Sequence, residues 1–313
     1  MLKRYNVAAL GAAVVYAKGL GAASRSAPAP APAASAVASA SKSQPTPAIS
    51  QFYSVVREET RGLPDRTVYR PADLKAVGPD VPVIVWANGG CRHANVFFAT
   101  ALSLLSARGF IVIADGAPEA VSTLSTAGGA QPQRMTEVID WVTKSKDAKK
   151  QFDGRASGTR IAVIGQSCGG IEALVAGADP RVDSVVSVNS GLFANGALGY
   201  GRDRLNELHS PVLFIHGGPE AIEYQNSVEN YALVDGPAAL VGAVGAGHAG
   251  IFYGIRDNTQ DGTIAVLEEG VTVLVQWFDY TLNGNSAAKA YFTDPSGLSS
   301  VPKWTVETKG LQP

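Results

Sequence analysis

The segment Ile161–Leu174 reads IAVIGQSCGGIEAL and decides the fold. Its first four apolar residues predict a buried strand, and the apolar spacing after Gly170 predicts a helix. Between them stands Ser167, with one glycine two residues before it and another two residues after it. A serine at such a strand-to-helix turn is held in a strained backbone conformation, and the glycines leave the turn the room it needs. The segment therefore predicts a nucleophile elbow, against the alternative of an ordinary glycine-rich loop.

Apolar runs on both sides of this segment predict a mostly parallel sheet. Most of them are continuous, as expected for strands covered by helices on both faces, and they alternate with helical patterns, which is typical of βαβ units. Two earlier segments, 53–57 and 66–70, are expected at an antiparallel edge. The strands are predicted over residues 81–87, 110–114, 159–164, 182–188, 211–215 and 239–244.

Three apolar stripes at helical spacing predict helices between the strands. They run over 98–105, 135–142 and 271–282, and Gly284 is placed to end the third helix. The connection 189–210 has room for only one short helix. The expected fold is therefore α/β, with helices on both faces of the sheet and no large cap domain.

Composition limits the classes of protein and partner. The 313 residues are 46% hydrophobic and 17% charged, which suits a globular chain with one large domain. The formal net charge is -1, and no basic run exceeds two residues. Nucleic acid is therefore not an expected partner, and we expect a monomer.

The amino-terminal residues predict export. Lys3 and Arg4 precede an apolar run that ends at Lys18, and small residues follow. This pattern is typical of a signal peptide over residues 1–23, whereas the run is too short for a membrane anchor. Residues 24–48 are mostly Ala, Pro and Ser and predict a disordered linker. The catalytic domain is then 49–313, secreted to the periplasm or the cell exterior without stable membrane insertion.

A serine hydroxyl needs a base within hydrogen-bond reach and an acid that orients this base. In the fold expected here, the order along the chain is serine, acid, histidine, with the base after the final strand. Among four histidines this order selects His248. The acid is expected after strand 211–215, where Glu220 is at the better offset and Glu223 is the reserve.

An oxyanion needs two preorganised N–H donors, one after the nucleophile and one in the loop after an earlier strand. Cys168 and Gly90 are the expected donors, and the alternative for Gly90 is a plain Gly-Gly turn. Cys91 and Cys168, the two cysteines of the chain, would then flank the same site. A disulfide between them and a pair of small buried thiols both remain possible at this point.

At these residues the chain resembles the secreted polyester hydrolase and cutinase-like branch of the α/β hydrolases, which includes lipases. The likeness spans residues 53–305, and it includes the acid loop 219–227 and the closing helix with Trp277. Gln166 stands where that branch usually has His or Trp, and Cys168 where it usually has Met. The resemblance implies the α/β-hydrolase fold and ester hydrolysis, and it leaves open whether polymers are substrates.

We therefore expect a serine hydrolase that cleaves carboxylic esters, small or polymeric, through an acyl-enzyme intermediate, with no cofactor or metal. Phe193 is expected either to line the acyl pocket or to belong to the core. A peptidase or thioesterase would need the same triad. A catalytically silent, hydrolase-like binding protein is the alternative from another class.

Overall fold

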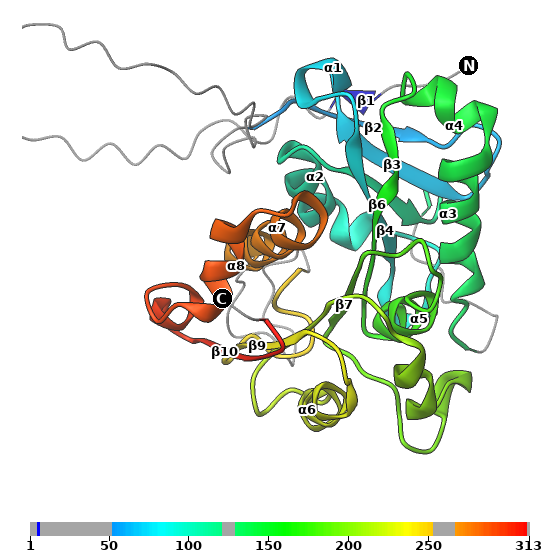
Figure 1. The fold of residues 1–313 in the computed structure, drawn as a ribbon. Helices are drawn as coiled ribbons and strands as arrows, with labels where there is room; N and C mark the ends of the chain where they lie inside the picture. Colours follow the sequence, from blue (N-terminus) through cyan, green and yellow to red (C-terminus); the bar gives the residue numbers. More distant parts are fainter. Residues whose placement is uncertain (1–4, 7–51, 121–128, 253–266, 312–313) are drawn as a thin grey trace, which may run out of the picture.

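The computed structural model describes residues 5–6, 52–120, 129–252 and 267–311. The predicted signal peptide and linker lie outside these residues, apart from Tyr5 and Asn6. The described part forms one mixed α/β unit around a mostly parallel sheet (Figure 1).

The sheet has ten strands in the order β1-β2-β3-β5-β4-β6-β7-β8-β9-β10. The six strands from β4 to β9 pair in parallel, whereas β1, β2, β3 and β10 pair antiparallel at the two sides. The strands are β1 (Tyr5–Asn6), β2 (Val55–Glu59), β3 (Arg66–Pro71), β4 (Val81–Ala87), β5 (Ile111–Asp115), β6 (Ala156–Gln166), β7 (Ser184–Val188), β8 (Val212–His216), β9 (Ala238–Ala243) and β10 (Trp304–Lys309).

Helices cover both faces of the sheet. The α-helices are α1 (Leu74–Val77), α2 (Ala99–Ala107), α3 (Gln133–Lys144), α4 (Lys146–Gln151), α5 (Cys168–Ala176), α6 (Tyr224–Leu233), α7 (Leu267–Asn283) and α8 (Ser286–Thr293). The 3-10 helices are η1 (Gly89–Cys91), η2 (Val96–Phe98), η3 (Ala197–Gly199), η4 (Arg202–Glu207) and η5 (Leu298–Ser300).

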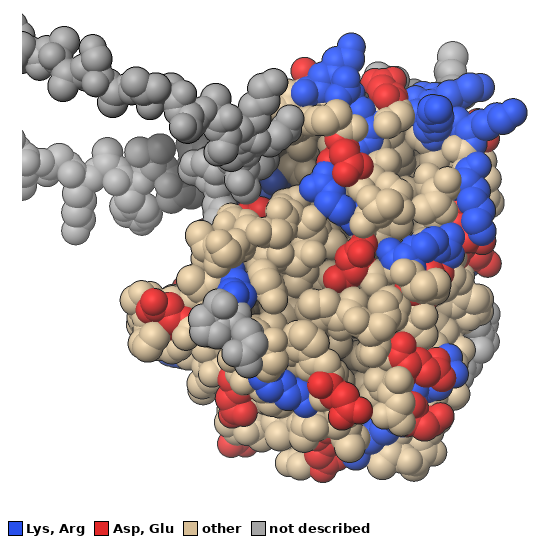
Figure 2. Space-filling view, in the orientation of Figure 1, with Lys and Arg blue, Asp and Glu red and all other residues tan. Residues whose placement is uncertain are grey.

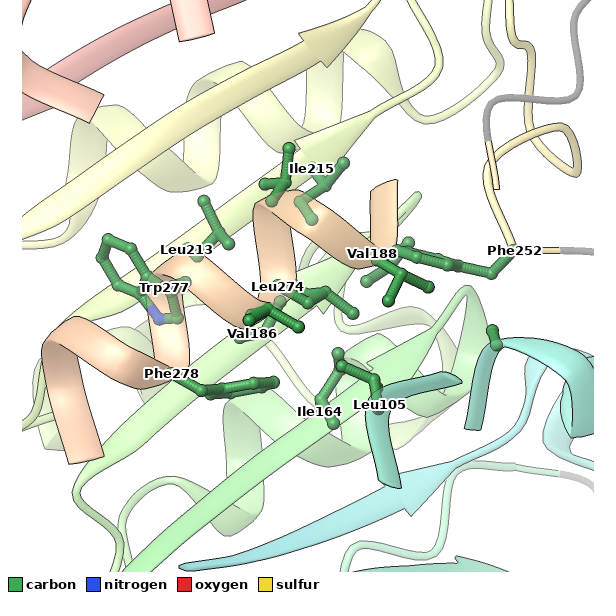
Figure 3. Close-up of a cluster of buried hydrophobic side chains, with 14 of the residues drawn as sticks. Leu105, Ile164, Val186, Val188, Leu213, Ile215, Phe252, Leu274, Trp277 and Phe278 are labelled. Atoms are coloured by element: carbon green, nitrogen blue, oxygen red, sulfur yellow. The ribbon is translucent and has the colours of Figure 1, made fainter. Parts of the chain in front are cut away.

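Two hydrophobic cores lie on opposite faces of the sheet, because successive strand residues point to opposite sides. In β4, Ile84 and Trp86 contribute to the core under α2, α7 and α8. Val83 and Val85 contribute to the core under α3, α4 and α5. Figure 3 shows the first core, where the rings of α7 lie against aliphatic side chains of β6, β7 and β8.

The structure confirms the predicted α/β class and most of the elements. The six predicted parallel strands are present with end shifts of a few residues, and β2 and β3 form the expected antiparallel edge. The connection between β7 and β8 holds only the short helices η3 and η4. The helices α1, α4, α6 and α8 and the antiparallel strands β1 and β10 were not predicted.

The surface mixes charges of both signs. On the face shown in Figure 2, basic and acidic side chains lie intermingled, and the basic ones are densest along the upper edge, where α1 and α4 lie. Within the described ranges, no helix is both long enough and apolar enough to cross a membrane.

Candidate active site

Ser167 lies at the sharp turn between β6 and α5. Its backbone has φ 54° and ψ -118°, a left-handed conformation that few residues other than glycine adopt. The Ser167 N–H donates to the carbonyl of Val188 at 2.9 Å, which ties the turn to β7. A Cβ at Gly165 would lie 2.1 Å from the carbonyl oxygen of Gly169, so the backbone crossing here requires glycine. The glycines therefore allow the turn that presents the serine at the carboxyl ends of the strands.

His248 follows β9 and reaches the serine. Its Nε2 is 3.0 Å from the Oγ of Ser167, within hydrogen-bond distance. Two contacts fix the loop that carries His248: the side-chain amide of Gln166 donates to its carbonyl at 3.0 Å, and the Gly247 N–H donates to the Gly217 carbonyl at 2.9 Å. The predicted partnership of residues 167 and 248 is thus present in the geometry.

The carboxylate next to His248 is that of Glu223, which corrects the choice of Glu220. Oε2 of Glu223 lies 2.7 Å from Nδ1 of His248, and the Glu223 side chain is buried. Glu220 is exposed to solvent. The path of the loop after β8 explains why the two glutamates differ. The Ala221 N–H donates to the Gly218 carbonyl and the Tyr224 N–H donates to the Ala221 carbonyl, and these turns coil the chain. Glu223, directly before α6, is thereby turned inward.

Glu223 occupies a site built for a charged carboxylate. Its Oε1 accepts hydrogen bonds from the side-chain amide of Asn189 at 2.7 Å and from the N–H of Gly217 at 3.0 Å. Burial opposes ionisation, but the hydrogen bonds from His248, Asn189 and Gly217 outweigh it and lower the pKa of Glu223 below its usual value. An ionised carboxylate at Nδ1 leaves Nε2 free to accept the serine proton.

Asn189 shows how the acid is supported from a neighbouring strand. It directly follows β7, has φ 47°, and donates its own N–H to the carbonyl of Ile215 at 2.7 Å. Asparagine tolerates this left-handed conformation better than most residues. Sequence reasoning did not single out Asn189, and the only available signal was an amide residue at the carboxyl end of a predicted parallel strand.

The two predicted oxyanion donors lie on neighbouring segments. Cys168 is the first residue of α5, and the first N–H groups of a helix have no partner within it. Gly90 lies in η1 with φ 68°, a conformation that favours glycine. The structure settles the open question of the cysteines, because Cys91 and Cys168 form a disulfide with their Cα atoms 5.2 Å apart.

Gln166 contacts two of the loops that form the site. Its side chain is buried, and it contacts both the loop after β4 and the loop after β9. A Cβ at Gly89 would lie 2.1 Å from the Oε1 of Gln166, so the backbone of the first loop passes directly over this amide. The residue before the serine therefore fixes the relative position of the two loops.

The remaining histidines lie elsewhere. His93 Nδ1 is 2.6 Å from Asp115 Oδ2. His216 ends β8 and packs its ring against Tyr224, and burial lowers its pKa to about 4. Among the described residues, neither ring is hydrogen-bonded to Ser167. Phe193 is 39% exposed, which removes it from the core, and its proposed contact with an acyl group stays a prediction.

Within the described residues, no group of three or more His, Cys, Asp or Glu side chains is arranged to hold a metal ion. The arrangement instead offers a hydroxyl, an imidazole and a carboxylate linked in series by hydrogen bonds. Such a series can transfer the hydroxyl proton to the ring while the carboxylate holds the ring in place.

No protein-family model matches this chain, and no curated protein sequence matches it at a significant level.

Proposed function

We propose that this chain is a serine hydrolase of the α/β-hydrolase fold that cleaves carboxylic esters. The observation that carries the proposal is the hydrogen-bonded series Ser167, His248 and Glu223, with its serine on a strained strand-to-helix turn. The order along the chain, serine then acid then histidine, is the order of that fold, with Glu223 as the acid.

The proposed reaction has two halves. The Oγ of Ser167 attacks the ester carbonyl while His248 accepts its proton, and the N–H groups of Gly90 and Cys168 stabilise the oxyanion. The protonated ring then gives its proton to the leaving alcohol, which leaves an acyl-enzyme. Water attacks this ester by the same route in reverse and releases the acid.

The test is the substitution Ser167→Ala, assayed with a short-chain nitrophenyl ester. We expect a fall in kcat of about 10⁶-fold, to the background of the assay, because the nucleophile is absent. A fluorophosphonate probe should label the wild-type protein at Ser167 and leave the variant unlabelled. Wild-type turnover by the variant would remove the assignment.

The same assay set separates esters from the alternative substrates that use an identical triad. An ester, a thioester and an amide with one common acyl group should be compared side by side. Between the ester and the amide, we expect the ester to have the higher kcat/KM, since an amide has the poorer leaving group. A preference for the amide would assign the site to peptide hydrolysis.

A further inference from the structure

The two oxyanion donors belong to separate segments, and one covalent bond joins those segments. We infer that the disulfide between Cys91 and Cys168 is a positioning element that holds the two donors in register, so that the hydrolase is fully active only when this bond is intact. The inference rests on the proposed function, and it adds a redox condition to it.

The disulfide lies next to both donor N–H groups along the chain. Cys168 itself carries one donor N–H, and Cys91 directly follows Gly90, which carries the other. The two cysteines are 77 positions apart in the sequence, yet their Cα atoms are 5.2 Å apart. A bond at this place therefore sets the spacing of the two N–H groups to which a single oxyanion would have to bind.

The backbone next to the bridge is in a conformation that needs external support. Gly90 has φ 68° and Cys91 has φ 51°, so two consecutive residues are left-handed. For cysteine this conformation costs energy, and such residues persist only where their surroundings hold them. The disulfide supplies that constraint at Cys91. Once it is cleaved, the tip of the loop can relax to a less strained backbone, and the Gly90 N–H turns with it.

The base of the loop has its own supports. The side-chain amide of Asn88 donates to the carbonyl of Arg92 at 3.0 Å and to that of Asp115 at 2.9 Å. Gly89 rests on the side chain of Gln166. Cleavage of the bridge should therefore leave the base of the loop in place and the triad intact, and displace the Gly90 donor alone.

Cleavage is a two-electron reduction. A phosphine attacks one sulfur, water supplies the oxygen of the phosphine oxide and the two protons, and both cysteines become thiols. Cys91 is only half-buried, whereas Cys168 is buried, so the reagent has access from the side of the loop.

The expected effect follows from where the donors act. They stabilise the oxyanion, which exists in the transition state and not in the bound ester, so displacement of the Gly90 donor lowers kcat and leaves KM nearly unchanged. Loss of one donor lowers kcat by about 10²–10³-fold in comparable sites. We expect about 10–100-fold here, because the Gly90 donor is displaced and not removed. The dependence of kcat on pH should keep its shape, because the triad is untouched.

The experiment compares the oxidised and phosphine-reduced full-length protein with the variants Cys91→Ser, Cys168→Ser and the double variant. Serine keeps the backbone N–H at residue 168. If the bridge acts as one unit, each single variant and the double variant should lose the same factor in kcat. Independent effects of two side chains would multiply instead. The double variant should also be insensitive to the phosphine.

Folding is controlled separately, because removal of a bridge also lowers the melting temperature. All rates are compared at a temperature well below the lowest melting point, with thiols counted in each sample. Reduced wild-type protein gives the comparison without any substitution, should the serine variants not fold. An unchanged kcat after complete reduction would overturn this inference alone. Absence of ester hydrolysis by the oxidised protein would overturn the proposed function as well.

Discussion

Two glutamates three positions apart have opposite surroundings. Glu220 is exposed, whereas Glu223 is buried and bonded to His248. The sequence pattern locates the loop that contains both glutamates but does not select one of them. The inward turn of Glu223 arises from local backbone hydrogen bonds. The signal that would have selected Glu223 is its place directly before α6, a helix that we did not predict.

This difference predicts the effect of removing each charge. Glu223→Gln should lower kcat by about 10³–10⁴-fold, since the amide no longer holds the imidazole in the correct tautomer or stabilises its protonated form. Glu220→Gln is the matched control, three positions away, and should stay within about twofold of wild type because surface substitutions have small effects. The measurement is steady-state ester hydrolysis. A larger loss for residue 220 than for residue 223 would contradict this assignment.

Close contact between backbones, and not side-chain chemistry, positions α5 on the sheet. A Cβ at Gly169 would lie 2.2 Å from the carbonyl oxygen of Ala87, at the end of β4. Such a distance cannot be relieved by a side-chain rotation, because the atoms that the Cβ would meet belong to the backbone of Ala87 and Asn88. The first turn of α5 can therefore approach β4 only with glycine at this position.

Gly169→Ala should consequently lower the free energy of unfolding by about 3 kcal/mol or more, through overpacking at a rigid contact. The turn that carries Ser167 should move with the helix, so that kcat falls as well. Gly236→Ala is the control, since no atom lies within 4 Å of the added Cβ. Urea unfolding gives the free energies. Equal stability of the two variants would show that α5 can shift without cost.

Most of the predictable elements have either a continuous apolar run or an apolar stripe at helical spacing. The central strands β4, β6 and β7 match the predicted segments because they are covered on both faces. Strand β10 was missed because it is an edge strand in which only Trp304 is buried. The disulfide was undecided in the sequence, because two cysteines near one predicted site are equally compatible with free thiols.

At the scale of the whole molecule, two buried titratable groups have opposite effects on the stability of the fold as the pH falls. Burial raises the pKa of Glu172 to about 7, with opposition from the N–H of Gln131. Burial lowers the pKa of His216 to about 4. Glu172 lies in α5, and His216 is the last residue of β8.

The two groups change the free energy of unfolding in opposite directions as the pH falls. Below pH 7 the folded protein takes up a proton at Glu172 that the unfolded chain binds only near pH 4.5, so acidification from 7 to 4.5 stabilises the fold through this group. Below pH 6.5 the unfolded chain binds a proton at His216, whereas the folded protein binds it only near pH 4. The same acidification therefore destabilises the fold through this group. Each shift corresponds to about 3 kcal/mol, and the two largely cancel.

Single substitutions should expose each contribution. Relative to wild type, Glu172→Gln should lose about 3 kcal/mol of unfolding free energy between pH 7 and pH 4.5, because only the destabilising proton uptake remains. His216→Asn should gain stability over the same range. Urea unfolding at several pH values measures both differences. Curves that run parallel to the wild-type curve at every pH would contradict the shifted pKa values.

The contact between Gly217 and Gly247 has a practical consequence. A Cβ at Gly217 would lie 2.0 Å from the carbonyl oxygen of Gly247, so the acid-bearing and histidine-bearing segments touch backbone to backbone. Libraries that randomise one of these segments at a time would mostly yield clones in which the other no longer fits. To engineer new selectivity here, one should transplant both segments together and retain the two glycines as a fixed joint.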